Sequence, residues 1–277
     1  MLYVFTAMYC EAKSIIDKLN LKKDNSIKKF QVFKKDNVVL TITGIGNVYA
    51  FSATSYIAGK FNISEYDTFI NIGICGTVNK NVSRGDLIIG NKVIDSLSRK
   101  CFYPDMIKSH DFLEGSIESF IKVVNEKELK NVKGEYIDME AAFFFQAANI
   151  FLPPHKIYCI KVVSDYLDGE FLTKDKVFEL ISYNVDKLLN FFVELNNFYK
   201  KPKSILSEKD KNLIDSISCK LKLSTSMKEE LIKLFKGYKI RNKKIDIELT
   251  SFYDIECKSK YEGKKYFGEI SEKLKSI

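Results

Sequence analysis

The sequence predicts an α/β protein with a mixed, mainly parallel sheet, followed by a small, mainly helical C-terminal region. Over the first two hundred residues, short apolar runs alternate with longer segments in which apolar residues recur every three or four positions. The chain has 277 residues and is 45% hydrophobic, which is enough for one large core and a smaller second one.

The expected strands are apolar runs bounded by glycine, proline or polar residues, and the expected helices carry one apolar stripe. Gly44 and Gly46 indicate a tight turn from a strand into a helix, whereas Gly73 and Gly76 are expected to end a strand. In chain order, we expect strands at residues 2–5, 30–33, 38–43, 68–72, 87–89, 119–124 and 157–163, and helices at residues 11–19, 48–61, 139–151 and 178–198.

A domain boundary is expected near residue 200, where a charged segment contains Pro202. We therefore divide the chain into a first domain, residues 1–199, and an extension, residues 200–277. The extension holds 20 Lys or Arg and 12 Asp or Glu, whereas the first domain holds 24 of each. The basic balance of the extension is interpreted as a lysine-rich solvated surface, and the alternative is a surface that binds single-stranded nucleic acid or a protein partner.

The extension contains signals for two helices and a strand. Ser226 and Glu229 fit a capping box at the start of a helix. Apolar residues alternate with charges over residues 245–249, as in a strand with one exposed face. Tyr266, Phe267, Ile270 and Leu274 form the stripe of a last helix.

The cysteine pattern favours a reducing compartment. Six cysteines are widely spaced and form no C-x-x-C pair, so we expect free thiols, a cytoplasmic location and neither a zinc site nor another metal or cofactor. The apolar start, Met1 to Met8, lacks a basic flank and is expected to be a strand, not a signal peptide. No stretch is long enough to cross a membrane, so no membrane partner is expected.

Four short motifs occur in an informative order. They are Ala7-Met8-Tyr9-Cys10-Glu11, Thr43-Gly44-Ile45-Gly46, Asn71-Ile72-Gly73-Ile74-Cys75-Gly76 with Gly85-Asp86, and Asp138-Met139-Glu140-Ala141-Ala142 followed by Ser164-Asp165. Together they resemble the purine nucleoside phosphorylase superfamily, and within it the methylthioadenosine/S-adenosylhomocysteine nucleosidases, over about residues 1–198. The resemblance implies a three-layer αβα sandwich, a homo-oligomer and cleavage of the N-glycosidic bond of a purine nucleoside.

The resemblance also implies roles for individual residues. Glu11 falls where the nucleosidases activate water, and Asp165 falls where they protonate the purine, which requires a proton on Asp165 near neutral pH. Met139 and Glu140 fall where the ribose is held. The full set of expected substrate-binding residues is Ile74, Gly76, Asp138, Met139, Glu140 and Ser164.

Each carboxylate also has a structural interpretation. Glu11 fits the first turn of a helix, where the helix dipole favours a negative charge. Asp138 fits a helix cap, and Asp165 fits an ordinary turn.

Three departures from the family pattern bear on function. Asn71 stands where phosphorylases carry a phosphate-binding arginine, which favours hydrolysis over phosphorolysis. Ile74 stands where a serine is usual. The segment between Asp86 and Asp138 is short and lacks the usual Ser-Gly-Asp stretch of the base pocket, for which residues 120–125 are the candidate replacement. The alternative function is therefore a nucleoside-binding module that has lost catalysis.

Phe143, Phe144 and Phe145 are consecutive in an expected helix. Successive helical residues are rotated by about 100°, so one core face should not accommodate all three rings. We therefore expect this helix to take part in a subunit interface.

Overall fold

The computed structural model describes residues 1–124, 129–169, 172–200, 204–242, 252 and 255–275. The chain divides into two compact units, Met1–Lys200 and Lys201–Ile277. Among the described residues, no helix is both long and apolar enough to cross a membrane.

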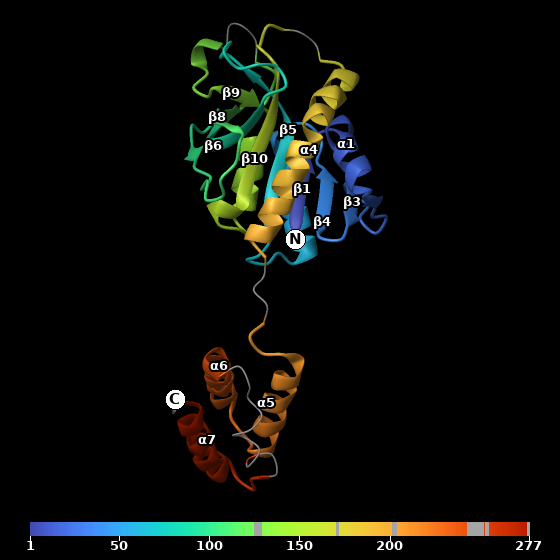
Figure 1. Cartoon of the computed structure of the whole chain (residues 1–277). Helices are drawn as coiled ribbons and strands as arrows, with labels where there is room; N and C mark the ends of the chain where they lie inside the picture. The colour runs from blue at the N-terminus through green and yellow to red at the C-terminus, as the bar shows by residue number, and fades with distance from the viewer. Residues whose placement is uncertain (125–128, 170–171, 201–203, 243–251, 253–254, 276–277) are drawn as a thin grey trace. The chain divides into compact units, whose positions relative to one another are not determined.

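The first unit contains one ten-stranded sheet and four α-helices (Figure 1). Its strands are β1 (Leu2–Thr6), β2 (Lys22–Lys23), β3 (Gln31–Lys35), β4 (Val38–Ile42), β5 (Thr68–Thr77), β6 (Leu87–Asp95), β7 (Cys101–Phe102), β8 (Leu113–Ser119), β9 (Tyr136–Asp138) and β10 (Ile157–Asp165). Its α-helices are α1 (Tyr9–Leu19), α2 (Asn47–Phe61), α3 (Ala141–Ala148) and α4 (Lys174–Phe198).

The central strands of the sheet run parallel. β4, β1, β5 and β10 are neighbours in this order, and each pair is parallel. β10 also pairs with β6, and β6, β8, β9 and β5 pair in turn, so five strands close a ring at one side of the sheet. Because the carboxyl ends of parallel strands lie at one edge, the residues after β1, in β5 and at the end of β10 are brought together there.

Helices cover both faces of the sheet, which confirms the predicted α/β fold class. Leu2 and Val4 of β1 pack in the core that contains α1 and α4, whereas Tyr3 and Phe5 pack in the core that contains α2 and α3. This alternation follows the two-residue period of a strand. Figure 1 shows α1 and α4 side by side in front of the sheet.

Several element boundaries differ from the prediction. β5 continues through Gly73 and Gly76, where we expected it to end. β8 ends at Ser119, where a strand was expected to begin, and α3 spans only Ala141–Ala148. The glycines of β5 make room for neighbouring side chains within the strand, as the site below shows.

The three phenylalanines of α3 are buried to different extents. Phe144 and Phe145 are fully buried, and the partly buried Phe143 packs against the same core. α3 contacts α2 as well as β5, β6, β8 and β10, so the protein surrounds it on several sides. All three rings thus contact the core of the protein itself, and the subunit interface expected for this helix, like the homo-oligomer, stays a prediction.

The second unit contains α5 (Glu208–Lys220), α6 (Thr225–Asn242) and α7 (Lys260–Lys275) around its own apolar core. The last expected helix is confirmed as α7, whereas α5 was not predicted. Ser207 caps α5. The hydroxyl of Ser224, not that of Ser226, accepts a hydrogen bond from the first turn of α6. The expected strand at residues 245–249 lies outside the described residues.

Candidate active site

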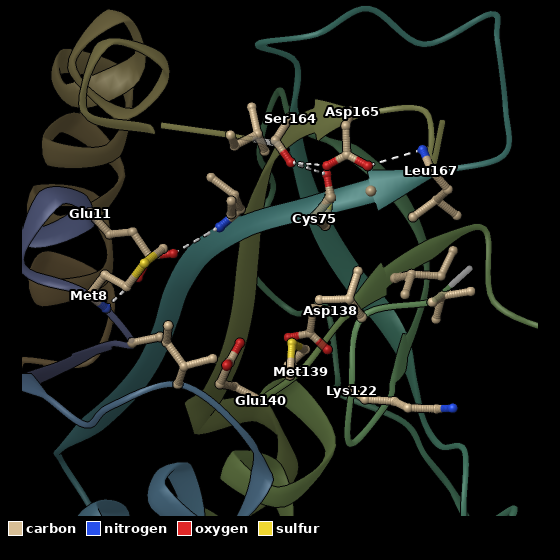
Figure 2. Close-up of a pocket in the computed structure, with 18 of the residues that line it drawn as sticks. Met8, Glu11, Cys75, Lys122, Asp138, Met139, Glu140, Ser164, Asp165 and Leu167 are labelled. Atoms are coloured by element: carbon tan, nitrogen blue, oxygen red, sulfur yellow. Dashed lines mark hydrogen bonds between the residues drawn. The ribbon is translucent and has the colours of Figure 1, made fainter. Parts of the chain in front are cut away.

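All eight expected site residues line one cavity of about 340 Å³ in the first unit. The cavity lies where β1, β5, β9 and β10 end, the edge at which open α/β sheets bind ligands. Figure 2 shows carboxylates from different elements around it. The eight residues are Glu11, Ile74, Gly76, Asp138, Met139, Glu140, Ser164 and Asp165.

Glu11 lies in the first turn of α1 and is 2% exposed. Its carboxylate accepts hydrogen bonds from the backbone N–H groups of Met8 at 2.8 Å and Ile74 at 3.2 Å. Burial raises the pKa of Glu11, and the positive charge of Lys161 opposes this shift. Glu11 therefore both caps its helix and presents a carboxylate of increased basicity to the cavity.

Glu140 is held at the start of α3 and is also buried. Gly46 donates its backbone N–H to Glu140 Oε1 at 2.7 Å, and the φ of +102° at Gly46 is one that favours glycine. Burial raises the pKa of Glu140 to about 7, with Lys161 lowering it and Asp138 raising it. Glu140 therefore changes charge near neutral pH.

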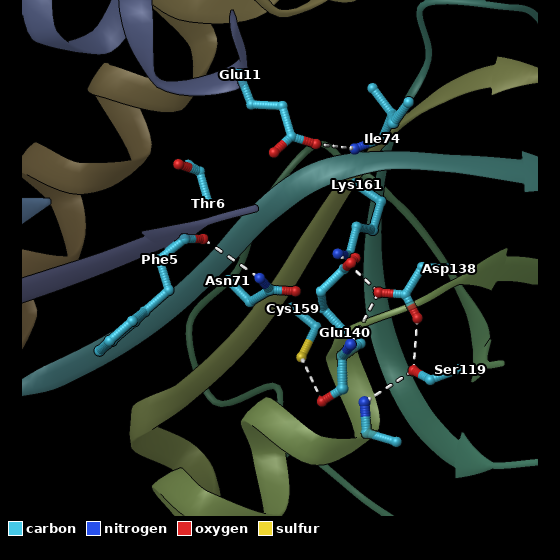
Figure 3. A network of polar contacts seen from close by, with 12 residues as sticks. Phe5, Thr6, Glu11, Asn71, Ile74, Ser119, Asp138, Glu140, Cys159 and Lys161 are labelled. Carbon is cyan, nitrogen blue, oxygen red and sulfur yellow. Dashed lines mark hydrogen bonds and ion pairs between the residues drawn. The ribbon is translucent and has the colours of Figure 1, made fainter. Parts of the chain in front are cut away.

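Asp138 caps α3, as its structural interpretation predicted. Its Oδ2 accepts the backbone N–H of Ala141 at 2.8 Å. The hydroxyl of Ser119 lies 2.5 Å from Asp138 Oδ1 and accepts the N–H of Ala142 at 2.8 Å. Ser119 and Asp138 together fix the start of α3 beside Glu140 (Figure 3).

Asp165 is at the carboxyl end of β10, next to a β-bulge. Its Oδ1 accepts the backbone N–H of Leu167 at 3.0 Å, and its Oδ2 lies 2.6 Å from the hydroxyl of Ser164. Leu167 has a φ of +58°, so the chain turns sharply just after the carboxylate. These contacts fix the orientation of the Asp165 side chain at the cavity wall.

Lys161 is the main residue that sequence reasoning missed. It is 1% exposed, and its Nζ lies 2.7 Å from Asp138 Oδ2, which is fully buried. Although burial opposes its charge, Asp138 and Glu140 raise the pKa of Lys161 above its ordinary value. Figure 3 shows this ammonium among the carboxylates beneath the cavity. A lysine within an otherwise apolar strand was the available signal, because a buried charge requires a partner.

The glycines of β5 allow the side chains of Glu11 and Asp165 to approach the strand closely. A Cβ on Gly73 would lie 2.8 Å from Glu11 Oε1, and a Cβ on Gly76 would lie 2.9 Å from Asp165 Oδ1. Lys122, Val123 and Val124 line the cavity, so part of the segment proposed to replace the usual base pocket does reach it. Asn71 does not line it; its side chain donates to the backbone oxygen of Phe5 at 3.2 Å.

Sequence comparisons identify relatives of this chain. A family model described as the phosphorylase superfamily matches residues 4–116. A 5′-methylthioadenosine/S-adenosylhomocysteine nucleosidase of Buchnera aphidicola subsp. Schizaphis graminum is 30% identical over 135 residues, which are 48% of this chain and 53% of that protein. The nucleosidase of Buchnera aphidicola subsp. Baizongia pistaciae is 25% identical over 73% of this chain and 92% of its own length. The chain thus spans about half the length of the first of these relatives.

A solved structure supports the same fold. The 5′-methylthioadenosine/S-adenosylhomocysteine nucleosidase of S. pneumoniae, bound to a transition-state inhibitor, superposes with a TM-score of 0.59 at 20% identity. The match covers 69% of this chain and 97% of that one. The resemblance predicted from the motifs is therefore confirmed: this chain is similar to proteins of the phosphorylase superfamily, among them methylthioadenosine/S-adenosylhomocysteine nucleosidases, and the solved structure shows the same fold.

Proposed function

We propose that the first unit hydrolyses the N-glycosidic bond of a purine nucleoside. The observation that carries this proposal is the convergence of Glu11, Glu140 and Asp165 on one cavity, in a chain whose relatives are named as nucleosidases. Methylthioadenosine and S-adenosylhomocysteine, which those names contain, are the first substrates to test. No metal or cofactor is required by this chemistry.

The proposed reaction divides the work between two carboxylates. Cleavage of the bond leaves positive charge on the sugar and negative charge on the purine, so a proton donor at the purine and a base that activates water both lower the barrier. Asp165 is the proposed donor. Glu11 is the proposed base, and burial favours this role because it raises the pKa of Glu11.

Glu140 and Met139 are the proposed ribose site. An ionised Glu140 can accept hydrogen bonds from two hydroxyl groups of the sugar, while Met139 supplies an apolar contact beside it. Lys161 and Asp138 lie below and hold the start of α3 in place. Ile74, at the position where the resemblance predicts a serine, gives this part of the cavity an apolar wall.

Water is the proposed nucleophile. None of the described residues that line the cavity is an arginine, and arginine is the side chain best suited to a bidentate phosphate contact. This lining favours hydrolysis over phosphorolysis.

The free state of all six cysteines fits the proposed cytoplasmic location.

The test is base release from methylthioadenosine, adenosine and inosine, measured by chromatography in phosphate-free buffer. We expect the wild-type protein to release base from at least one of them. Glu11→Gln and Asp165→Asn keep the side-chain volumes and should each lower kcat by about 10² or more, since general acid–base catalysis is worth at least that. Release of base at the wild-type rate by either variant would remove that residue from the mechanism.

A further inference from the structure

Ser164 is the extra residue of the β-bulge beside the cavity. Where β10 pairs with β5, Val163 lies opposite Cys75 and Asp165 lies opposite Gly76, so Ser164 has no partner in the register. A regular strand would place Ser164 and Asp165 on opposite faces, whereas a bulge re-aims one of them. Figure 2 shows the outcome, with the Ser164 hydroxyl beside the Asp165 carboxylate.

The Ser164 hydroxyl has two acceptors and one hydrogen. Its Oγ lies 2.6 Å from Asp165 Oδ2 and 3.0 Å from the carbonyl oxygen of Cys75. One O–H group donates to only one of them at a time. The shorter distance is typical of a hydroxyl that donates to a charged carboxylate, and the longer one is that of a weaker neutral bond.

We propose that Ser164 is a positioning residue that acts through Asp165, stabilising the carboxylate formed when Asp165 gives its proton to the leaving purine. This proposal rests on the proposed function. While Asp165 is neutral, the Ser164 hydroxyl donates to the carbonyl of Cys75. When Asp165 becomes charged, the hydroxyl turns to Oδ2, and this new charge-assisted bond favours proton transfer.

The step is balanced within the proposed reaction. The proton of Asp165 moves to a ring nitrogen of the purine, and the electron pair of the C1′–N bond stays with the purine. The water oxygen bonds to C1′, and its proton moves to Glu11. Ser164 exchanges one acceptor for another and gains or loses no proton.

This role differs from direct substrate binding, which the sequence resemblance implied for Ser164. The residue is 1% exposed, and its single hydrogen is taken by a protein acceptor in either state of Asp165. Loss of the hydroxyl should therefore affect the reaction of the bound substrate more than its binding.

A change at Ser164 should act on Asp165 rather than on the other ionisable groups of the site. Burial raises the pKa of the Cys75 thiol, which keeps this nearest titratable neighbour on β5 neutral. Among the described residues that line the cavity, the other charged side chains are Glu11, Lys122, Asp138 and Glu140, which come from α1, the segment after β8, the end of β9 and the start of α3. Lys161 of β10 lies below them and pairs with Asp138.

The test compares the pH dependence of kcat and KM in the full-length wild-type protein and in Ser164→Ala. We expect kcat to fall about tenfold, the value of one hydrogen bond to a charged group, and KM to stay unchanged. The alkaline limb of the kcat profile should move to higher pH, because the charged form of Asp165 loses a donor. If Ser164→Ala does not fold, Ser164→Cys takes its place in the test. Cysteine nearly keeps the side-chain volume and is only a weak donor, so the same changes in kcat and in the alkaline limb are expected.

Ser14→Ala is the matched control, because Ser14 is a buried serine of α1 whose hydroxyl has no partner among the described residues. This variant should leave the acidic and the alkaline limb of the kcat profile at their wild-type pH. A raised KM with an unmoved alkaline limb in the Ser164 variants would overturn the proposal in favour of direct substrate binding. A lower kcat with an unmoved limb would reduce Ser164 to a structural role and overturn it as well.

A second readout separates this proposal from the proposed function. A protonated carboxyl on Asp165, which the proposal requires, would give an infrared band that is absent in Asp165→Asn. If the wild-type protein released no base from any nucleoside, the proposed function would fail, and this band would still test the role of Ser164. If the band persists to higher pH in Ser164→Ala than in the wild-type protein, the proposal is supported. If the band disappears at the same pH in both proteins, the proposal is contradicted.

Discussion

At the scale of single residues, one buried ammonium sets the charge of the site. Lys161 pairs with Asp138, and its charge also lowers the pKa values of Glu11 and Glu140. Removing charged groups from water is costly, so a buried carboxylate without such a partner would bind a proton instead. Lys161 thus allows several carboxylates to share a small cavity.

Glu140 should make stability depend on pH. Its pKa is about 7 in the folded protein and 4.5 as an ordinary glutamate, so the folded state binds more protons between these values. The stabilisation from Glu140 is present below about pH 4.5 and is lost as pH rises through about 7. The free energy of unfolding of the wild-type protein, relative to Glu140→Gln, should fall by about 3 kcal/mol over this range.

Urea unfolding at a series of pH values measures this difference. Asp186→Asn is a suitable control, because Asp186 is exposed on α4 and pairs with Lys18 at the surface. It should change stability by about 0–1 kcal/mol with no transition near pH 7. A constant difference between the wild-type protein and Glu140→Gln from pH 4.5 to 8 would show that Glu140 is not held with a raised pKa.

The sequence allowed the motif residues to be predicted, but not the residues that hold them in place. Glu11, Glu140 and Asp165 were found because their motifs occur in a recognisable order, and all three line the cavity. Lys161 and Ser119 were missed, since their importance comes from contacts with Asp138 across different strands. Such contacts depend on the register of the sheet, which no local pattern reveals.

At the scale of elements, the glycines of β5 position the proposed water-activating group. Gly73→Ala would place a methyl group 2.8 Å from Glu11 Oε1 and 3.4 Å from Lys161 Nζ. The carboxylate must then move away from Ile74. We expect kcat for base release to fall by about 10², the usual cost of misplacing a catalytic group by about 1 Å.

Gly59→Ala provides the control for this prediction. Gly59 is in the interior of α2, and a Cβ there meets nothing within 4 Å. Alanine should leave base release unchanged and stabilise the protein by up to about 1 kcal/mol, because alanine is the better helix former. Equal kcat in Gly73→Ala and the wild-type protein would show that the position of Glu11 does not depend on this close approach.

Elements with a clear apolar period were predicted well, and irregular ones were not. The strands at β1, β3, β4 and β10 and the helix α2 follow their patterns closely. The continuation of β5 through its glycines and the bulge at Ser164 depend on side chains that approach from α1 and from the turn after β10. The side chains from α1 are distant from β5 in the sequence. The residues after β10 have the pattern of an ordinary turn, and this pattern does not indicate a bulge.

At the scale of the whole molecule, two units have separate cores. Among the described residues, the candidate site cavity is lined only by residues of the first unit, and the three helices of the second unit pack around their own apolar side chains. We therefore expect a chain ending at Lys200 to keep kcat and KM for base release within about twofold of the full-length values. Steady-state kinetics of both proteins measures this. A loss of about tenfold or more would assign the second unit a part in catalysis.

The alternative role predicted for the C-terminal extension, binding of nucleic acid or of a protein partner, stays a prediction. The balance of 20 basic and 12 acidic residues over residues 200–277 favours an anionic partner, but acidic residues also pair with lysines on the surface of this unit, as Asp215 does with Lys228. Binding of single-stranded nucleic acid by the full-length protein should weaken steeply with salt and disappear in the chain ending at Lys200. A solvated lysine-rich surface would show no such binding in either protein.

Product analysis distinguishes hydrolysis from phosphorolysis and from the absence of any activity. The wild-type protein is incubated with methylthioadenosine in the presence and absence of inorganic phosphate, and the purine and sugar products are identified by mass spectrometry. We expect free adenine and free methylthioribose in equal amounts, at the same rate with or without phosphate. Formation of a sugar 1-phosphate, or release of base only when phosphate is present, would contradict hydrolysis. Release of no base from methylthioadenosine, adenosine or inosine would contradict the proposed function itself.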